Sequence, residues 1–296
     1  PSLHSSPIGT HITYDDAIDK ISFFDAVLVG VKTGEYGRKL LKLANKKNIF
    51  SCIIDYADDF EVYKKSNYQN HKLICRNFEY KRDFQIFFKH DIPLDLDIKY
   101  LEPLAPMPIK FENYPSLQSI FFKDKIYDFS FVGRIHNNIH NARRSIINLL
   151  ENVSKKYYIK EYINNDIKRL SLKNYCEILN KSKICLSPWG KVWDSARHPE
   201  SAVYGNVPLI PKPNCKLANN LSLNDDNAIV YETEKYGDIF KIKNHDLINE
   251  RLNFCINNEN EFNKLSRNWY LEIKNKNTLL ERAKYILNRI EIHMKN

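Results

Sequence analysis

The feature that most constrains the fold is an alternation of short apolar strands with amphipathic helices. DAVLVGV (25–31) is an apolar run rich in β-branched residues, and NIFSCIID (48–55) is a second. Between them, Leu40, Leu41 and Leu43 lie on one face of a predicted helix. Strands that are apolar on both faces and joined by a helix predict a buried parallel sheet. We therefore expect an α/β fold.

The same alternation continues along the chain in two series. The segment EPLAPMPIKFENYPS (102–116) holds four prolines in fifteen residues and separates the series, as a linker would. Before it we expect strands at 72–75 and 98–104 and a helix at 80–89. After it we expect strands at 127–133, 157–163, 183–187, 207–211 and 227–232, helices at 142–153, 171–182 and 200–205, and a helical segment from 245 to 296 with a break near 275–277.

This pattern predicts two Rossmann-like domains that face a cleft, followed by a helical C-terminus. We place the N-terminal, acceptor-side domain at 1–110 and the C-terminal, nucleotide-binding domain at 111–296. Two such domains describe the GT-B architecture, although two flavodoxin-like domains would give the same periodicity.

Charge and cysteine content narrow the function classes. The net charge is +9, and the charges are mixed along the chain, so they indicate either a solvated Lys-rich surface or attraction to an anionic partner. No nucleic-acid motif is present. None of the six cysteines forms a CxxC pair, and no Cys/His spacing suits zinc.

The cysteines and the hydropathy pattern also bear on location. Several cysteines lie in apolar runs, which is typical of buried free thiols in a reducing compartment. No apolar run approaches about 18 residues, so we expect no transmembrane helix. No signal peptide is visible, and because the chain begins with Pro1 a leader could have been removed. We expect a cytoplasmic protein, and the charge leaves peripheral contact with a membrane open.

The stretch SPWGKVWDSARHPESAVYGNVPLI (187–210) carries the clearest chemistry. A strand ends near Pro188, so the next loop lies at the carboxyl edge of a sheet, where open α/β sheets bind ligands. A short helix follows, with Gly205 suited to its C-terminal end. Glu200 then lies in the first turn, where its carboxylate can accept hydrogen bonds from two vicinal hydroxyls. Arg197 can bind a diphosphate through two parallel hydrogen bonds.

Alternatives to these assignments follow from ordinary helix chemistry. Glu200 could cap the helix and pair with Arg197 on the surface. Pro199 is expected to begin the helix, with His198 extended before it. Trp189 and Trp193 could stack on a base or sugar, or fill a core.

Two further loops are candidate sites. Gly133 ends a strand and is followed by Arg134 and His136, a junction that suits a phosphate or is a plain surface turn, whereas Arg143 and Arg144 are expected on the surface. The glycines at 30, 34 and 37 form neither a dinucleotide fingerprint nor a Walker A motif.

Asp55, Asp58 and Asp59 follow a buried strand, where a carboxylate can act as a general base or simply cap a loop. They form no D-x-D metal motif. Asp58 is our candidate base, with His4 and His11 as less supported alternatives.

The residues Ser187, Pro188, Gly190, Ser195, Arg197, Glu200, Gly205 and Pro208 resemble the C-terminal motif of exostosin-like and related GT-B glycosyltransferases. The resemblance extends over roughly 55–231 and is sharpest over 180–210. It implies that Glu200 holds the ribose of a donor nucleotide. Pro199 departs from the family, which has a bulky apolar residue there. The candidate donor-binding residues are Gly133, Arg134, Ser187, Pro188, Trp189, Gly190, Ser195, Arg197 and Glu200.

The sequence therefore predicts a metal-independent hexosyl- or pentosyltransferase. It would move a sugar from a nucleotide-sugar donor to a hydroxyl of a glycan or other acceptor, with no cofactor and no nucleic-acid partner. A two-domain protein that binds a nucleotide or sugar without chemistry is the alternative. A different nucleotide-dependent enzyme on a Rossmann-like scaffold is a third possibility.

Overall fold

The structure of the chain is a computed structural model. The chain folds into two compact units. The first comprises Pro1–Ala105, Asn214–Asn219 and Leu280–Asn296, and the second comprises Pro106–Pro213 and Asn220–Leu279. The residues that the structure describes are 13–30, 34–55, 72–75, 78–81, 84–90, 92–104, 124–133, 141–154, 156–161, 170–188, 193, 195–236 and 239–296.

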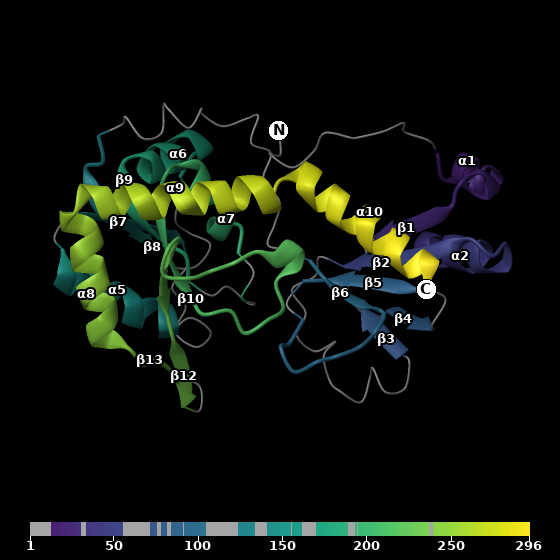
Figure 1. The fold of residues 1–296 in the computed structure, drawn as a ribbon, viewed down its shortest axis with the longest axis horizontal. Coiled ribbons are helices and arrows are strands. Elements are labelled where there is room, and N and C mark those ends of the chain that lie inside the picture. Colours follow the sequence, from purple (N-terminus) through teal and green to yellow (C-terminus); the bar gives the residue numbers. More distant parts are fainter. Residues whose placement is uncertain are drawn as a thin grey trace. The chain divides into compact units, whose positions relative to one another are not determined.

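The first unit is built on a parallel sheet of four strands in the order β1-β2-β5-β6, with a separate antiparallel hairpin of β3 and β4 (Figure 1). Helix α2 covers one face through Leu41 and Ala44, and α10 covers the other through Ile286 and Ile290. The elements are α1 (Tyr14–Asp19), η1 (Ile21–Phe23), β1 (Ala26–Gly30), α2 (Gly34–Lys46), β2 (Phe50–Asp55), β3 (Lys72–Cys75), β4 (Phe78–Lys81), β5 (Ile86–Lys89), β6 (Leu101–Pro103) and α10 (Leu279–Lys295).

The predicted helix at 80–89 is wrong. Its first residues belong to β4, and its apolar end forms β5, a strand inside the parallel sheet. All four residues of β5 are buried, because a central parallel strand is covered on both faces. A continuous apolar run of this length does not distinguish a helix from a buried strand.

Glu102 fixes α10 to the first sheet. Its carboxylate accepts hydrogen bonds from Arg289 at 2.5 Å and Tyr285 at 3.5 Å, and lies 2.8 Å from Nε2 of His293. By its contacts α10 therefore belongs to the first unit, whereas the sequence analysis assigned it to the second domain. The domain limits at 110 and 111 fall among residues outside the described ones and stay a prediction.

The second unit is built on a parallel sheet of five strands in the order β11-β10-β9-β7-β8. Helices α5 and α8 cover one face, and α6 and α7 pack on the other, with α9 against α7. The elements are β7 (Tyr127–Gly133), α5 (Asn141–Val153), β8 (Tyr157–Glu161), α6 (Leu172–Asn180), β9 (Ser182–Leu186), α7 (Arg197–Val203), β10 (Val207–Pro211), η5 (Ala218–Asn220), β11 (Ile229–Tyr231), β12 (Thr233–Tyr236), β13 (Ile239–Ile242), α8 (His245–Asn257) and α9 (Glu259–Lys276).

The predicted strands and helices of this unit are present with their ends shifted by up to three residues, and so is the break before α10; residues 162 and 163 of the strand predicted at 157–163 lie outside the described ones. A second break, at Asn258 between α8 and α9, was not predicted; its side chain caps α9 by accepting a hydrogen bond from the backbone of Glu261.

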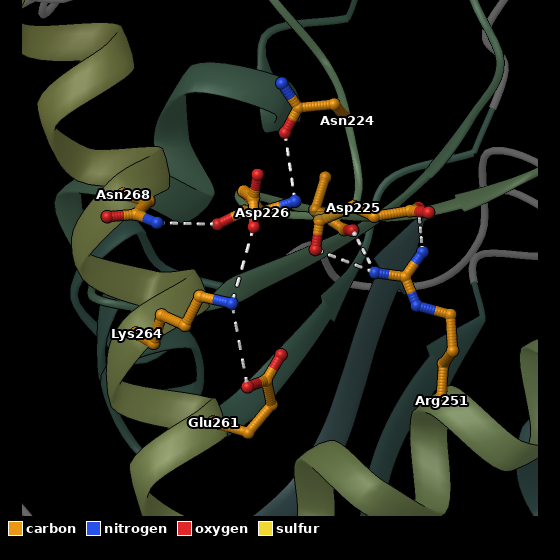
Figure 2. A network of polar contacts seen from close by, with 8 residues as sticks. Asn224, Asp225, Asp226, Arg251, Glu261, Lys264 and Asn268 are labelled. Atoms are coloured by element: carbon orange, nitrogen blue, oxygen red, sulfur yellow. Dashed lines mark hydrogen bonds and ion pairs between the residues drawn. The ribbon is translucent and has the colours of Figure 1, made fainter.

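A network of hydrogen bonds and ion pairs connects residues 224–226, in the loop before β11, to helices α8 and α9 (Figure 2). Arg251 on α8 pairs with the Asp225 carboxylate and also donates to its carbonyl oxygen. On α9, Lys264 lies 3.4 Å from the Asp226 carboxylate, and the amide of Asn268 donates to the Asp226 carbonyl oxygen at 2.8 Å. This loop lies at the amino end of β11, so the network fixes the helices at the edge opposite the strands' carboxyl ends.

Both units contain free cysteines. Cys52, Cys176, Cys185, Cys215 and Cys255 are free, and all except Cys176 are buried. None of the helices that the structure describes is long and apolar enough to cross a membrane.

Candidate functional site

The candidate site lies at the carboxyl edge of the second sheet. Strand β7 ends there at Gly133, and β9 ends just before Ser187 and Pro188. Helix α7, which begins at Arg197, connects this edge back to β10. Open parallel sheets bind ligands along this edge, because loops and helix N-termini gather there.

Arg197 reaches across the end of β7. Its Nη2 donates to the carbonyl oxygen of Val132 at 2.5 Å, and its Cζ lies 5.2 Å from the centre of the Phe131 ring. The guanidinium lies next to the position that a side chain on residue 133 would occupy. A Cβ added to Gly133 would lie 2.7 Å from Nη2. Gly133 is therefore required for this close approach. The Nε–H of Arg197 is buried and has no hydrogen-bond partner among the described residues.

Arg143 is a second guanidinium at this edge. It lies near the start of α5 and is only 7% exposed, so its predicted surface position is wrong, whereas Arg144 is exposed as expected. Burial first, and then the neighbouring charge of Arg197, lower the pKa of Arg143 to about 10. Arg143 remains cationic at neutral pH.

Tyr231 adds a polar atom beside Arg143. It ends β11, and its side chain is fully buried. Its hydroxyl has no hydrogen-bond partner within the described parts of the chain. Burial raises the pKa of Tyr231 well above its ordinary value, with the charge of Arg143 acting in the opposite direction.

Glu200 lies in the first turn of α7, as predicted, and a tyrosine holds it. The hydroxyl of Tyr175 on α6 donates to Oε2 of Glu200 at 2.8 Å. Burial raises the pKa of Tyr175 well above its ordinary value, and the negative charge of Glu200 raises it further. Tyr175 therefore stays protonated and serves as a donor to the carboxylate. A surface ion pair between Glu200 and Arg197 is not found; Arg197 bonds to Val132 instead.

Ser187 helps to hold the loop between β9 and α7 through its contact with His198. It is fully buried, and its hydroxyl lies 2.6 Å from Nδ1 of His198. Nε2 of the same ring lies 2.7 Å from the carbonyl oxygen of Trp193. A carbonyl oxygen only accepts, so Nε2 carries the proton and Ser187 donates to Nδ1. The ring thereby connects the end of β9 to the loop before α7.

The start of α7 differs from the prediction. The helix begins at Arg197, two residues before Pro199, and His198 is helical. Proline is tolerated in the third position because the first four N–H groups of a helix have no partner within it. The other end is as predicted: Gly205 has φ 62°, its N–H donates to Ala202, and the N–H of Asn206 donates to Ser201.

The remaining predicted residues divide into two groups. The hydroxyl of Ser195 accepts a hydrogen bond of 3.4 Å from the backbone of Arg197, and Pro188 is buried. Trp193 is 1% exposed and donates to the carbonyl oxygen of Pro211, so the core assignment is correct for this tryptophan. Asp58, Arg134, Trp189 and Gly190, together with His4, His11, Asp59 and His136, lie outside the described residues.

In the first unit, one of the predicted carboxylates has a structural role. Asp55 ends β2 and is 2.8 Å from Nζ of Lys89, which ends β5, and both side chains are nearly inaccessible. A buried ion pair of this kind fixes the ends of the two strands. No cluster of three His, Cys, Asp or Glu side chains suited to a metal ion occurs among the described residues.

Comparison with known proteins relates the chain to others by fold. No protein-family model matches it, and no curated protein matches it. A crystal structure of TarM matches with a TM-score of 0.55 at 11% identity, over 90% of this chain and 54% of that one. A glycosyltransferase from Rickettsia africae matches with a TM-score of 0.55 at 9% identity, over 99% of this chain and 84% of that one.

A pneumococcal O-GlcNAc transferase, GtfA, in complex with UDP and GlcNAc, matches with a TM-score of 0.50 at 10% identity, over 95% of this chain and 60% of that one. The chain thus spans about half the length of TarM. At these identities the likeness shows the fold: two Rossmann-like sheets and a helical C-terminus, as in GT-B glycosyltransferases. The exostosin-like subtype stays a prediction.

Proposed function

We propose that the protein is a glycosyltransferase that moves a sugar from a nucleotide-sugar donor to a hydroxyl of a glycan or other acceptor. The observation that carries this proposal is that Arg197 lies across the end of β7 at the carboxyl edge of the second sheet, with Glu200 in the same first turn of α7 and the buried Arg143 guanidinium near the start of α5. The GT-B fold and the resemblance of 187–210 to exostosin-like enzymes support it.

The two arginines suit a diphosphate. In the transfer, the acceptor oxygen forms a bond to the anomeric carbon, while the bond from that carbon to the diphosphate oxygen breaks and leaves its electrons on the diphosphate. Fixed guanidinium groups stabilise that developing charge without a metal ion, because they need no reorganisation during the reaction. The buried Nε–H of Arg197 is one donor for such an anion. We therefore propose a metal-independent reaction with no cofactor.

Glu200 suits the ribose. A carboxylate accepts several hydrogen bonds, and two vicinal hydroxyls can donate to it together. Ser187, Pro188 and Ser195 hold the loop that leads to α7, and we place Gly133, Arg134, Trp189 and Gly190 around the nucleotide. Asp58, after β2 of the first unit, is proposed as the base that takes the proton of the acceptor hydroxyl.

Location is a further proposal. Buried free thiols favour a reducing compartment, so we propose that the protein acts in the cytoplasm. Its charge of +9 favours contact with an anionic membrane surface, where a lipid-linked acceptor would lie. Sedimentation with phosphatidylserine vesicles at low and high salt tests this contact.

The test of the donor site combines a nucleotide screen with one substitution. Thermal-shift measurements with UDP-, GDP-, dTDP- and CMP-sugars identify the donor; a ligand at 100 times its dissociation constant adds about 2.7 kcal/mol of stability. Glu200→Gln should then lower donor affinity at least about tenfold, since hydrogen bonds to a charged group contribute roughly 1.5–3 kcal/mol each. Calorimetric titration measures this loss.

Glu177→Gln is the matched control, because this glutamate is exposed on the neighbouring helix α6. Equal donor affinities for Glu200→Gln and the control would remove Glu200 from the site. Release of free nucleotide from the donor during incubation distinguishes an enzyme from a protein that only binds the nucleotide.

A further inference from the structure

The bond between Tyr175 and Glu200 joins two helices at the candidate site. Tyr175 comes from α6 and Glu200 from the first turn of α7, and the hydroxyl-to-carboxylate distance is 2.8 Å. A glutamate side chain has three rotatable bonds, so a carboxylate that must accept two hydroxyls at once loses affinity if it has to be ordered on binding. A fixed donor removes that cost before the ligand arrives.

We propose that Tyr175 is a positioning residue that orients the Glu200 carboxylate for the donor's ribose. This inference rests on the proposed function. A phenol suits the task, because it donates one hydrogen bond and leaves the carboxylate with further acceptor positions. Its position is itself fixed, since α6 packs through Ile178 and Leu179 on the face of the sheet that α7 also covers.

The raised pKa of Tyr175 agrees with this role. Burial acts first and the Glu200 charge second, and both keep the hydroxyl protonated over the whole working range of pH. The donor to Glu200 is therefore present at every pH at which the enzyme would act.

The test uses the recognition of ribose hydroxyls as its readout. Wild type and Tyr175→Phe are titrated with UDP and with 2′-deoxy-UDP, or with the corresponding pair for the nucleotide found in the screen. UDP is the first choice because a structure of S. aureus TarM and that of pneumococcal GtfA both contain it. We expect Tyr175→Phe to weaken UDP binding about five- to tenfold and 2′-deoxy-UDP binding much less, since only the former engages both hydroxyls.

The control is Tyr204→Phe. Tyr204 follows α7, and its hydroxyl lies 2.8 Å from Sγ of Cys176 on α6, so this variant removes a contact between the same two helices without touching Glu200. It should leave the ratio of the two affinities at the wild-type value. Because the ratio is taken within one variant, a smaller folded fraction lowers the stoichiometry of both titrations equally and does not change it.

A double-mutant cycle completes the test. In a Glu200→Ala background, Tyr175→Phe should have no further effect on the affinity ratio, because the carboxylate that it orients is gone. An unchanged ratio in Tyr175→Phe alone, with wild-type UDP binding intact, overturns the positioning role and leaves the proposed function standing. If the wild type binds none of the nucleotides in the screen, both proposals fail.

Discussion

Replacing Gly133 with alanine tests the position of Arg197 directly. The new Cβ would lie 2.7 Å from Nη2 of Arg197 and 2.9 Å from Cζ of Phe131. An ordinary contact begins at 3.4 Å, so the guanidinium must move by the difference between 3.4 and 2.7 Å, which is 0.7 Å. That shift lengthens its 2.5 Å bond to Val132 and moves its charge away from the proposed diphosphate position.

The expected result is a loss of nucleotide affinity of about tenfold or more, because a hydrogen bond that involves a charged group contributes roughly 1.5–3 kcal/mol. Crowding should also lower the free energy of unfolding by about 1–3 kcal/mol. Calorimetric titration with the best nucleoside diphosphate, and denaturant unfolding, measure the two effects separately. Titration with the matching nucleoside is a useful comparison, because it lacks the diphosphate and should lose little affinity.

Gly30→Ala is the matched control. Gly30 also ends a parallel strand, but a Cβ there would meet nothing within 4 Å. This variant should keep wild-type affinity and stability, or gain a few tenths of a kcal/mol, since alanine restricts the unfolded chain. If Gly133→Ala binds the nucleoside diphosphate as tightly as Gly30→Ala does, Arg197 does not bind the diphosphate and the reasoning is refuted.

Three further outcomes follow from the site and the fold. Sugar transfer should continue in EDTA; complete loss that manganese restores would contradict a metal-independent reaction. Asp58→Asn should abolish turnover while nucleotide affinity persists, as single-turnover assays and calorimetry would show, and a normal transfer rate would place the base elsewhere. Lys89→Met should lower the free energy of unfolding by about 3–5 kcal/mol, because it removes the ammonium group from beside the buried Asp55 carboxylate. Adding Asp55→Asn should recover most of that loss in denaturant unfolding; no recovery would refute the pairing argument.

The parts of the fold that sequence alone predicted are those where local pattern and burial agree. Strands β7, β9 and β10 are short runs of apolar residues bounded by turn signals, and the sheet buries them on both faces. The same kind of run in β5 is predicted as a helix, because a short apolar run alone does not distinguish a helix from a buried strand. Only pairing with β2 and β6 decides between the two structures, and pairing is not a local property.

Prediction of the site from the sequence has the same limit, because contacts between distant segments are not local properties. Arg143 precedes Ile146, Ile147 and Leu150 at intervals of three, four and seven, so it continues the buried stripe of α5, and this spacing could have identified it. No local pattern could have identified Tyr175 as the partner of Glu200, since the two are joined only when α6 and α7 pack on the same face of the sheet.

Most of the contacts of helix α7 are to the core. A helix of seven residues is unstable by itself, so tertiary contacts must supply its stability. The His198 ring is bound by Ser187 and Trp193, and the indole N–H of Trp269 donates to both the His198 carbonyl oxygen and the Ser201 hydroxyl.

These contacts hold the first turn in place from the core side. Arg197 and Glu200, the charged residues of that turn, are then fixed at the sheet edge by hydrogen bonds to Val132 and Tyr175. A guanidinium fixed in this way binds an anion, and a carboxylate fixed in this way accepts hydroxyl groups, at a low ordering cost. Packing therefore constrains the described part of this stretch, and it holds the Arg197 and Glu200 side chains at the edge of the sheet.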